Sequence, residues 1–199
     1  MAEFRTIKQQ CTGEFKDKGS KFIAYAQSCY TEEDAKKLID DLRKQHHKAR
    51  HVCYAFKIGL TDPLMRMNDD GEPSNTGGQP IMNYIRKYRL DNVAIAVVRY
   101  FGGTLLGKGG LIKAYGGAAE EAIKNADIIR LYEKCKFNII VPFSNYAPVL
   151  DTLKAFGADI LNEKFDSACH MLVLVNKDSY EELHNKLLES NVESIELIS

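Results

Sequence analysis

The spacing of apolar and polar positions predicts alternating strands and helices in the first part of the chain. Strands are expected at Phe4–Cys11 and Lys21–Tyr30, joined through the turn signal KDKGS, and at the alternating stretch His51–Gly59. Thr31 is expected to cap a helix, with Asp34 at the third helical position of a capping box. One face of that helix carries the apolar residues Ala35, Leu38, Ile39 and Leu42.

A wholly apolar run and the glycine-rich stretch after it occupy the middle of the chain. Val93–Val98 predicts a strand covered on both faces, and a helical stretch near Ile81–Tyr88 precedes it. Arg99–Gly117 follows and leads into a helix whose shared face is Tyr115, Ala118, Ala119, Ala122 and Ala126. Alanine at these positions predicts close packing on a sheet. Leu60–Pro80 has no periodicity and is expected to be a long loop, the kind that is functional or disordered.

The pattern changes at Tyr132 and predicts a second unit. A strand is expected over Tyr132–Val141, a helix from about Asn145, and strands near Ala158–Phe165 and Ala168–Val175. Asp178 is expected to cap the next helix, and the closing segment VESIELIS predicts a last strand. The order β-α-β-β-α-β is that of a ferredoxin-like domain. The sequence therefore predicts two α+β domains, residues 1–131 and 132–199.

Charge divides in the same way as the pattern. The whole chain of 199 residues has 27 Lys+Arg and 27 Asp+Glu. Up to Arg130 there are 21 basic and 16 acidic residues, a difference of +5, and the remainder has 6 and 11, a difference of −5. A mild basic surplus permits nucleic-acid binding by the first domain without arguing strongly for it.

Cysteine usage and hydropathy point to the cytoplasm. Five cysteines are scattered without a CxxC pair, so neither a zinc knuckle nor a disulfide framework is indicated, and reduced thiols are expected. No run approaches the ~18 apolar residues of a membrane span, and MAEFRTIKQQ lacks the apolar region of a signal peptide. We expect a cytoplasmic protein without a membrane partner; the oligomeric state stays open.

The glycine-rich segment is the first candidate site. A glycine-rich turn between a strand and a helix is the general geometry for binding phosphate. The expected nucleic-acid or phosphate-binding residues are Arg99, Tyr100, Phe101, Gly102, Gly103, Gly107, Lys108, Gly109, Gly110 and Lys113. The segment is not a P-loop, because Gly109 stands where Ser or Thr would follow the lysine, and it does not match a dinucleotide fingerprint. The alternative is a tight bend with close helix packing through Gly116 and Gly117.

The polar loop before it is the second candidate. Its residues of interest are Asp69, Asp70, Gly71, Glu72, Pro73 and Thr76. The carboxylates could hold Mg²⁺ or supply a general base, whereas the turn residues and solvated acids offer an ordinary explanation. His46, His47 and His51 lack the spacing of a metal site, and Cys53 lacks a partner base. No catalytic residue, metal site or cofactor is predicted.

Several long motifs resemble the IMPACT family, in particular its bacterial members of the YigZ/YvyE type. They are SKFIA (Ser20–Ala24), HVCYAF (His51–Phe56), DDGEPSNTGGQPI (Asp69–Ile81) and VVRYFGGTLLGKGGLIKAYGGAA (Val97–Ala119). Their order and spacing match as well, and the resemblance covers essentially the whole chain. One small departure is Gly77, where the family more usually has alanine.

The resemblance implies a fold for each domain and a setting for the function. It implies a first domain like the second domain of ribosomal protein S-five, followed by a ferredoxin-like domain similar to the last domain of translocating elongation factors. Eukaryotic IMPACT proteins are translation regulators that act under amino-acid stress through a scaffold protein. The extra domain that they use for that partner has no counterpart in this sequence.

Three functions follow as hypotheses. The leading one is a cytoplasmic regulatory protein linked to translation, which binds RNA, the ribosome or a translation factor through the Arg99–Lys113 surface and the Asp69–Pro80 loop. The first alternative is an enzyme acting on a phosphorylated or nucleotide substrate, with Mg²⁺ held by Asp69–Glu72. The second is a protein-interaction module that does not bind nucleic acid.

Overall fold

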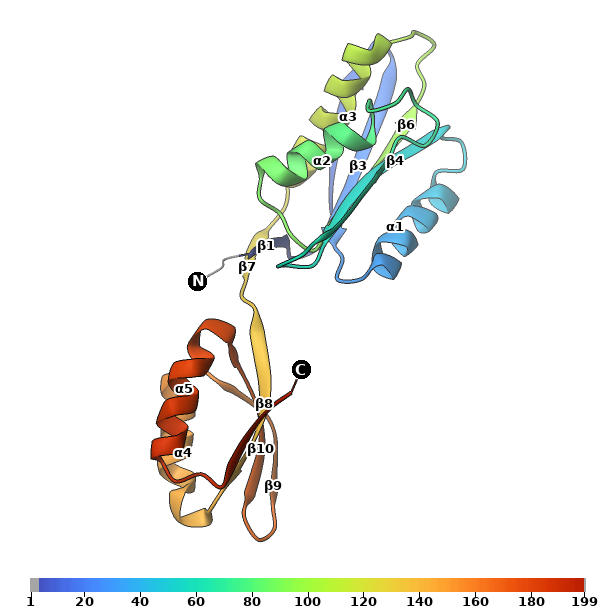
Figure 1. Ribbon diagram of the computed structural model, residues 1–199. Helices are drawn as coiled ribbons and strands as arrows, with labels where there is room; N and C mark the ends of the chain where they lie inside the picture. Colours follow the sequence, from blue (N-terminus) through green and yellow to red (C-terminus); the bar gives the residue numbers. More distant parts are fainter. Residues whose placement is uncertain (1–3, 199) are drawn as a thin grey trace. The chain divides into compact units, whose positions relative to one another are not determined.

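The computed structural model describes residues 4–198, which divide into two compact units. The first unit is Phe4–Leu131, and the second contains the chain from Tyr132 onward. Both are α+β, as expected from the sequence (Figure 1). No helix within residues 4–198 is long and apolar enough to cross a membrane.

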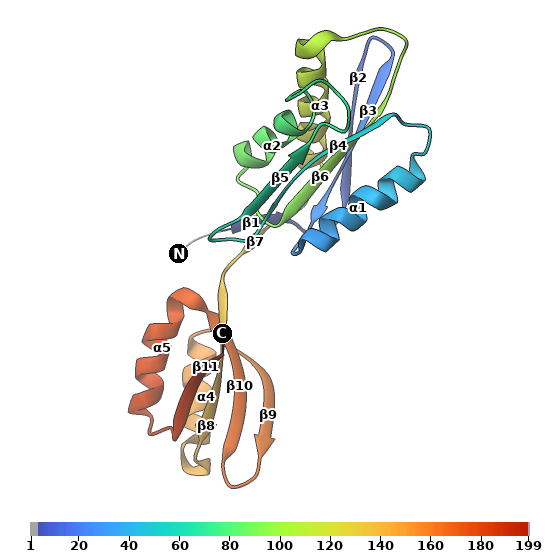
Figure 2. The ribbon, with the colours of Figure 1, turned by 45° about the vertical axis from the view of Figure 1, so that its right-hand side comes forward.

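An antiparallel five-stranded sheet forms the centre of the first unit. The strand order is β2 (Cys11–Asp17), β3 (Ser20–Ser28), β6 (Val93–Tyr100), β4 (His51–Ile58) and β5 (Leu64–Asn68). Helices α2 (Gly78–Lys87) and α3 (Gly107–Lys124) cover one face, and α1 (Glu32–Gln45) covers the other (Figures 1 and 2). A separate pair, β1 (Phe4–Ile7) and β7 (Ile128–Leu131), joins the two ends of this unit.

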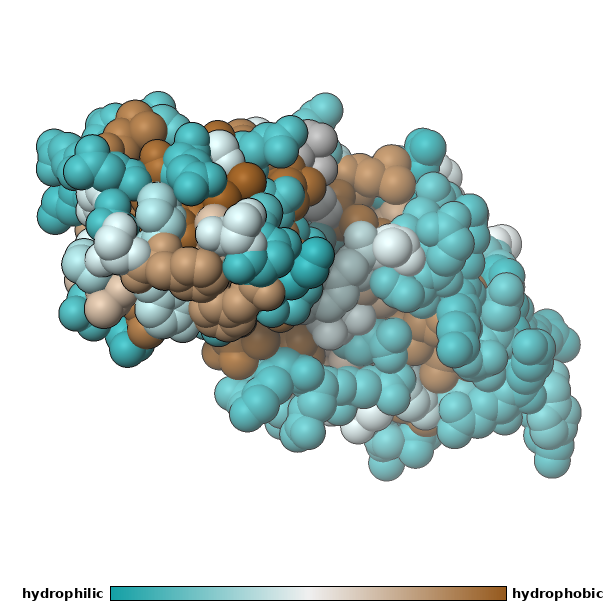
Figure 3. Space-filling view, turned by 90° about the horizontal axis from the view of Figure 1, so that it is seen from below, coloured by the Kyte–Doolittle hydropathy of each residue, from teal (hydrophilic) through white to brown (hydrophobic). Residues whose placement is uncertain are grey.

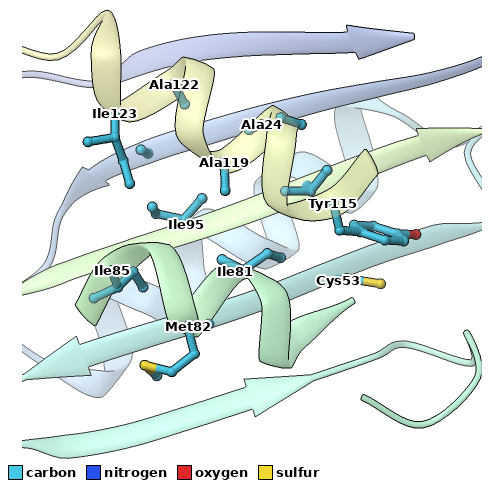
Figure 4. Close-up of a cluster of buried hydrophobic side chains, with 14 of the residues drawn as sticks. Ala24, Cys53, Ile81, Met82, Ile85, Ile95, Tyr115, Ala119, Ala122 and Ile123 are labelled. Carbon is cyan, nitrogen blue, oxygen red and sulfur yellow. The ribbon is translucent and has the colours of Figure 1, made fainter. Parts of the chain in front are cut away.

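Strand β6 is buried on both faces because helices pack on both sides of the sheet. Ile95 and Val97 face α2 and α3, while Ala96 and Val98 face α1. Figure 4 shows Ile95 beneath α2 and α3. Small side chains let α3 approach: a Cβ added at Gly13 of β2 would lie 2.1 Å from the backbone nitrogen of Ala122. The wholly apolar run is therefore the central strand, as expected.

The two edge strands of this sheet, β2 and β5, differ from what the sequence predicts. The strand expected over Phe4–Cys11 ends at Ile7, and a second strand, β2, begins at Cys11. Strand β5 lies inside the stretch expected to be a loop. Most side chains of β5 are exposed, so its sequence lacks the alternation of apolar and polar residues by which a strand is recognised. Hydrogen bonds to β4 hold β5 in the sheet.

The capping box expected at the start of α1 is present, because the Thr31 side chain accepts a hydrogen bond from Asp34 N at 3.1 Å.

The second unit has the ferredoxin-like arrangement. Its elements are β8 (Lys134–Val141), α4 (Tyr146–Ala155), β9 (Asp159–Phe165), β10 (Cys169–Asn176), α5 (Lys177–Glu189) and β11 (Ser194–Ile198). The sheet order is β11-β8-β10-β9, with antiparallel pairs and both helices on one face (Figure 1). Asp178 lies in the first turn of α5 rather than at its N-cap, which is Asn176.

Apolar side chains reach the surface of this second unit. In the view from below, brown side chains stand among hydrophilic ones (Figure 3). Phe143 and Phe165 are each more than half exposed, and their rings stack with centroids 6.4 Å apart. Single exposed apolar residues are ordinary, so this pair by itself defines no site.

Candidate functional site

The site lies at the end of the first unit's sheet where β6 ends and its two neighbours, β3 and β4, begin. Antiparallel pairing places Phe22 and His51 opposite Arg99, one on each neighbouring strand. The loops that follow β5 and β6 reach the same end of the sheet (Figures 1 and 2). Phe22, Arg99 and His51, which are far apart in the sequence, therefore lie side by side across three strands.

Arg99 is buried, contrary to the expectation that it contacts phosphate at the surface. Its guanidinium Nη1 donates to Glu72 Oε1 at 2.5 Å, and both side chains are more than nine-tenths buried. The Tyr115 hydroxyl donates to the same oxygen at 2.8 Å. The rings of Phe22 and Phe101 both lie 5.5 Å from Arg99 Cζ. Glu72 of the polar loop is therefore bonded to both β6, through Arg99, and α3, through Tyr115.

His51 and Cys53 complete this polar row along β4. The carbonyl of Asp70 lies 2.7 Å from His51 Nδ1 and can only accept, so Nδ1 carries the proton. The other ring nitrogen, Nε2, lies 3.9 Å from Glu72 Oε1, and it accepts a hydrogen bond whenever Nδ1 carries the ring's single proton. Burial raises the pKa of the Cys53 thiol far above its usual range, and burial likewise raises that of Tyr115. Cys53 is therefore a protonated thiol, which is a poor nucleophile.

The carboxylates of Asp69 and Asp70, like that of Glu72, are bonded within the chain. Asp69 Oδ1 accepts from the backbone nitrogens of Gly77 and Gly78 at 2.8 and 2.9 Å, and thus caps α2. Asp70 accepts from Arg43 at 2.7 Å and from Val52 N at 2.8 Å. Among the described residues, no three His, Cys, Asp or Glu side chains are grouped to hold a metal. The geometry does not favour the Mg²⁺ hypothesis.

The rest of this loop serves to place Glu72. Asp70 and Gly71 have φ of +44° and +86°, and Glu72 N donates to Asp69 O at 2.9 Å, which closes a tight turn. Thr76 donates through its hydroxyl to the carbonyl of Pro73 at 2.6 Å. The turn directs Glu72 toward Arg99 rather than toward solvent.

The glycines between β6 and α3 have different structural reasons. A Cβ at Gly102 would lie 1.9 Å from Gly19 C, and Gly103 and Gly107 have φ of +87° and +68°. Gly110 packs on the Leu106 side chain, while Gly116 and Gly117 pack on the rings of Tyr84 and Phe15. An added Cβ at Gly109 would meet nothing within 4 Å. Gly109 alone in this group lacks both a positive φ and a close neighbour.

The start of α3 is open and carries unpaired cations. Leu106 at the N-cap makes no capping hydrogen bond, and Lys108 and Lys113 are exposed. In residues 4–198 neither lysine forms an ion pair. Phe101 is 45% exposed, whereas the Tyr100 hydroxyl turns to the other face of the sheet and bonds His46 Nδ1 at 2.8 Å. The structure thus separates Tyr100 from the other candidate residues.

A pocket of about 210 Å³ opens beside the buried ion pair. Its lining residues are Arg50, His51, Glu72, Arg99, Phe101 and Leu105. The sequence patterns do not single out Arg50 or Leu105, and they predict no binding role for His51. The strand start at His51 was the available signal, because its antiparallel partner at the end of β6 is Arg99.

The fold and this site together define a two-unit α+β protein whose first unit has an exposed, glycine-rich helix start beside a polar pocket. Residues 18–123 match the family model of the Impact N-terminal domain. An IMPACT family member of Haemophilus influenzae is 31% identical, over 96% of this chain and 94% of its own length. The chain therefore belongs to the IMPACT family, as the sequence motifs indicated.

Two further likenesses agree with this membership. The IMPACT family member YvyE of Bacillus subtilis is 40% identical over 62% of this chain and 57% of its own length. A crystal structure titled as that of a hypothetical protein superposes with a TM-score of 0.73 at 25% identity. It covers 100% of this chain and 98% of the other, so the likeness extends across both units.

Proposed function

We propose that this protein is a cytoplasmic regulatory protein linked to translation, which binds RNA through the turn and helix start between Phe101 and Lys113. Membership of the IMPACT family supports the link to translation, since eukaryotic members regulate that process. RNA of the translation machinery, on the ribosome or with a translation factor, is the expected partner.

The observation that carries the proposal is a contrast between two helix starts in the same unit. At the start of α2, the backbone N–H groups of Gly77 and Gly78 donate hydrogen bonds to the carboxylate of Asp69. At the start of α3 no side chain of residues 4–198 caps the helix, and the first turn contains Lys108 beside Gly109. A helix start with free N–H groups and added positive charge attracts phosphate.

The residues of this surface then have distinct roles. Lys108 and Lys113 neutralise phosphates, and Gly109 lets the backbone of the RNA approach the helix without a side chain between them. Phe101 offers an exposed ring for stacking on a base, a contact worth roughly 1–3 kcal/mol. The buried guanidinium of Arg99 packs against the Phe101 ring and does not itself contact phosphate.

Fluorescence anisotropy with labelled single-stranded RNA, structured RNA and DNA at two salt concentrations tests the proposal. We expect binding that weakens with salt, and about tenfold weaker binding by a Lys108→Ala/Lys113→Ala variant with a smaller salt slope. A Lys36→Ala/Lys37→Ala variant on α1, at the opposite face of the sheet, is the matched control. Absence of binding below about 100 μM contradicts the proposal, because non-specific binders reach roughly 10⁻⁴–10⁻⁶ M.

A further inference from the structure

The pocket beside Arg99 contains two hydrogen-bond acceptors that the protein does not use. Arg99 and Tyr115 both bond Oε1 of Glu72, and in the described residues Oε2 has no hydrogen-bond partner. The ring of His51 offers the second acceptor at Nε2 whenever its single proton is on Nδ1, which donates to the Asp70 carbonyl. Both side chains line the same cavity.

Donors and an apolar wall complete the lining. Arg50 lines the pocket, is exposed, and forms no hydrogen bond or ion pair through its side chain among residues 4–198. Leu105 is 83% exposed and Phe101 is 45% exposed, so an apolar chain and a ring face solvent at a charged site. The lining therefore carries the guanidinium groups of Arg50 and Arg99 as donors and the carboxylate of Glu72 as an acceptor.

We infer that this pocket receives a guanine base of the RNA strand whose phosphates lie on the start of α3. The inference rests on the proposed function and names the base that the pocket selects. Guanine presents two adjacent donors, N1–H and N2–H₂, beside the acceptor O6. The donors match Glu72 Oε2 and His51 Nε2, and O6 matches the guanidinium of Arg50, which is a common partner of guanine.

The other bases fit this set of groups less well. Adenine and cytosine each place a ring acceptor beside one amino group, so an acceptor would face the carboxylate. Uracil offers a single donor between two carbonyls. Splayed bases of single-stranded RNA are recognised by such contacts to the Watson–Crick edge combined with stacking on an aromatic ring, which Phe101 provides here.

The buried ion pair holds this arrangement before any ligand arrives. Glu72 is fixed by Arg99 and Tyr115, and His51 is fixed by the Asp70 carbonyl. Little side-chain freedom is therefore lost when a base binds. Arg99 is a positioning residue in this scheme. Its Nε is buried without a hydrogen-bond partner, the one such side-chain atom in the part of the chain described.

The test compares nine-nucleotide RNAs that differ at one central position, with uridine at all others. The full chain is titrated with oligonucleotides carrying guanosine, adenosine, cytidine or inosine at the centre. We expect guanosine to bind at least tenfold more tightly than adenosine, with inosine between them, because inosine lacks only the N2 amino group. Glu72→Gln is expected to abolish the preference, so that the guanosine and adenosine RNAs bind with equal affinity.

A second variant guards against loss of folding in Glu72→Gln. Leu105→Ser alters an exposed side chain and is expected to weaken binding of the guanosine RNA several-fold more than binding of the all-uridine RNA. Lys36→Ala is the control that should change neither. Equal affinity for all central bases overturns the inference and leaves the proposed RNA binding intact.

Guanosine monophosphate alone separates the two proposals from the other side. Saturation-transfer NMR measures its binding against adenosine monophosphate. If the chain prefers the guanosine nucleotide but binds no RNA, the pocket stands and the proposed function fails. If neither the nucleotide nor the RNA shows a guanine preference, the inference is overturned.

Discussion

Asp69 shows how one side chain can serve the fold at the place where chemistry was suspected. Its two oxygens accept hydrogen bonds from three backbone nitrogens, those of Asn75, Gly77 and Gly78, at 2.8 to 2.9 Å. These nitrogens belong to a loop and to a helix start that would otherwise lack partners. The carboxylate therefore organises the loop and the beginning of α2 together.

Replacing Asp69 by alanine should destabilise the first unit by about 2 kcal/mol or more. The loss combines a missing helix cap with backbone donors left unsatisfied in a partly buried loop. Urea denaturation of the full chain measures the change, with Asp62→Ala at an exposed position as the control. Equal midpoints for the two variants would contradict this role.

Gly109 and Gly102 should respond oppositely to the same substitution. Gly109→Ala is expected to stabilise α3 by about 0.5–1 kcal/mol, because the position is helical and open, while it weakens RNA binding. Gly102→Ala should destabilise, since the added Cβ meets the backbone of Gly19. Thermal melts of both variants give the sign directly. A Gly109→Ala variant with lower stability would contradict this explanation.

At the scale of elements, the buried pair of Arg99 and Glu72 ties strand β6 to the polar loop. Arg99→Met should cost about 3–5 kcal/mol, because it leaves the Glu72 carboxylate buried with one hydrogen bond fewer. Arg99→Met/Glu72→Gln should cost clearly less than the sum of the single changes. A double-mutant cycle by chemical denaturation measures this coupling, and additive costs would show that the pair is not coupled.

His46 links the end of α1 to two strands and should make the unit sensitive to acid. Its ring nitrogens bond the hydroxyls of Tyr25 and Tyr100, both at 2.8 Å, and burial lowers its pKa. The folded state thus favours the neutral ring, so this stability is present above the usual value of 6.5 and declines as pH falls below it. His46→Gln should flatten the dependence of the urea midpoint between pH 7 and 5. An unchanged slope would contradict it.

At the scale of the whole molecule, each unit has its own hydrophobic core. The buried clusters of residues 4–131 do not share members with the cluster around Phe137, Ile139 and Leu183. The pairing of β1 with β7 closes the first unit on itself. Division at residue 131, as the charge and hydropathy patterns suggested, is consistent with this organisation.

Residues 1–131 should fold and bind RNA without the second unit. Because the second unit carries the acidic surplus, its removal should also tighten RNA binding at low salt, and less so at 0.15 M, where screening over about 8 Å reduces the effect. Circular dichroism and anisotropy of the two lengths make the comparison. An unfolded 1–131 fragment would contradict the independence of the units.

Local patterns in the sequence were sufficient for much of the architecture. The apolar run Val93–Val98 became the central strand because helices cover both of its faces. The capping box at Thr31 and the β-α-β-β-α-β order after Tyr132 depend on neighbouring residues, so they could be recognised without a structure. The edge strand β5 could not, because its exposed side chains leave no periodic signal.

By itself, the sequence determined most of the elements, the α+β class and membership of the IMPACT family. Only the tertiary structure decided what the site residues do, because strand register and burial choose their partners. Register sets His51 opposite Arg99, and a tight turn brings Glu72 onto both. Burial then makes Arg99 half of an ion pair, whereas the start of α3, where we propose that phosphate binds, stays exposed.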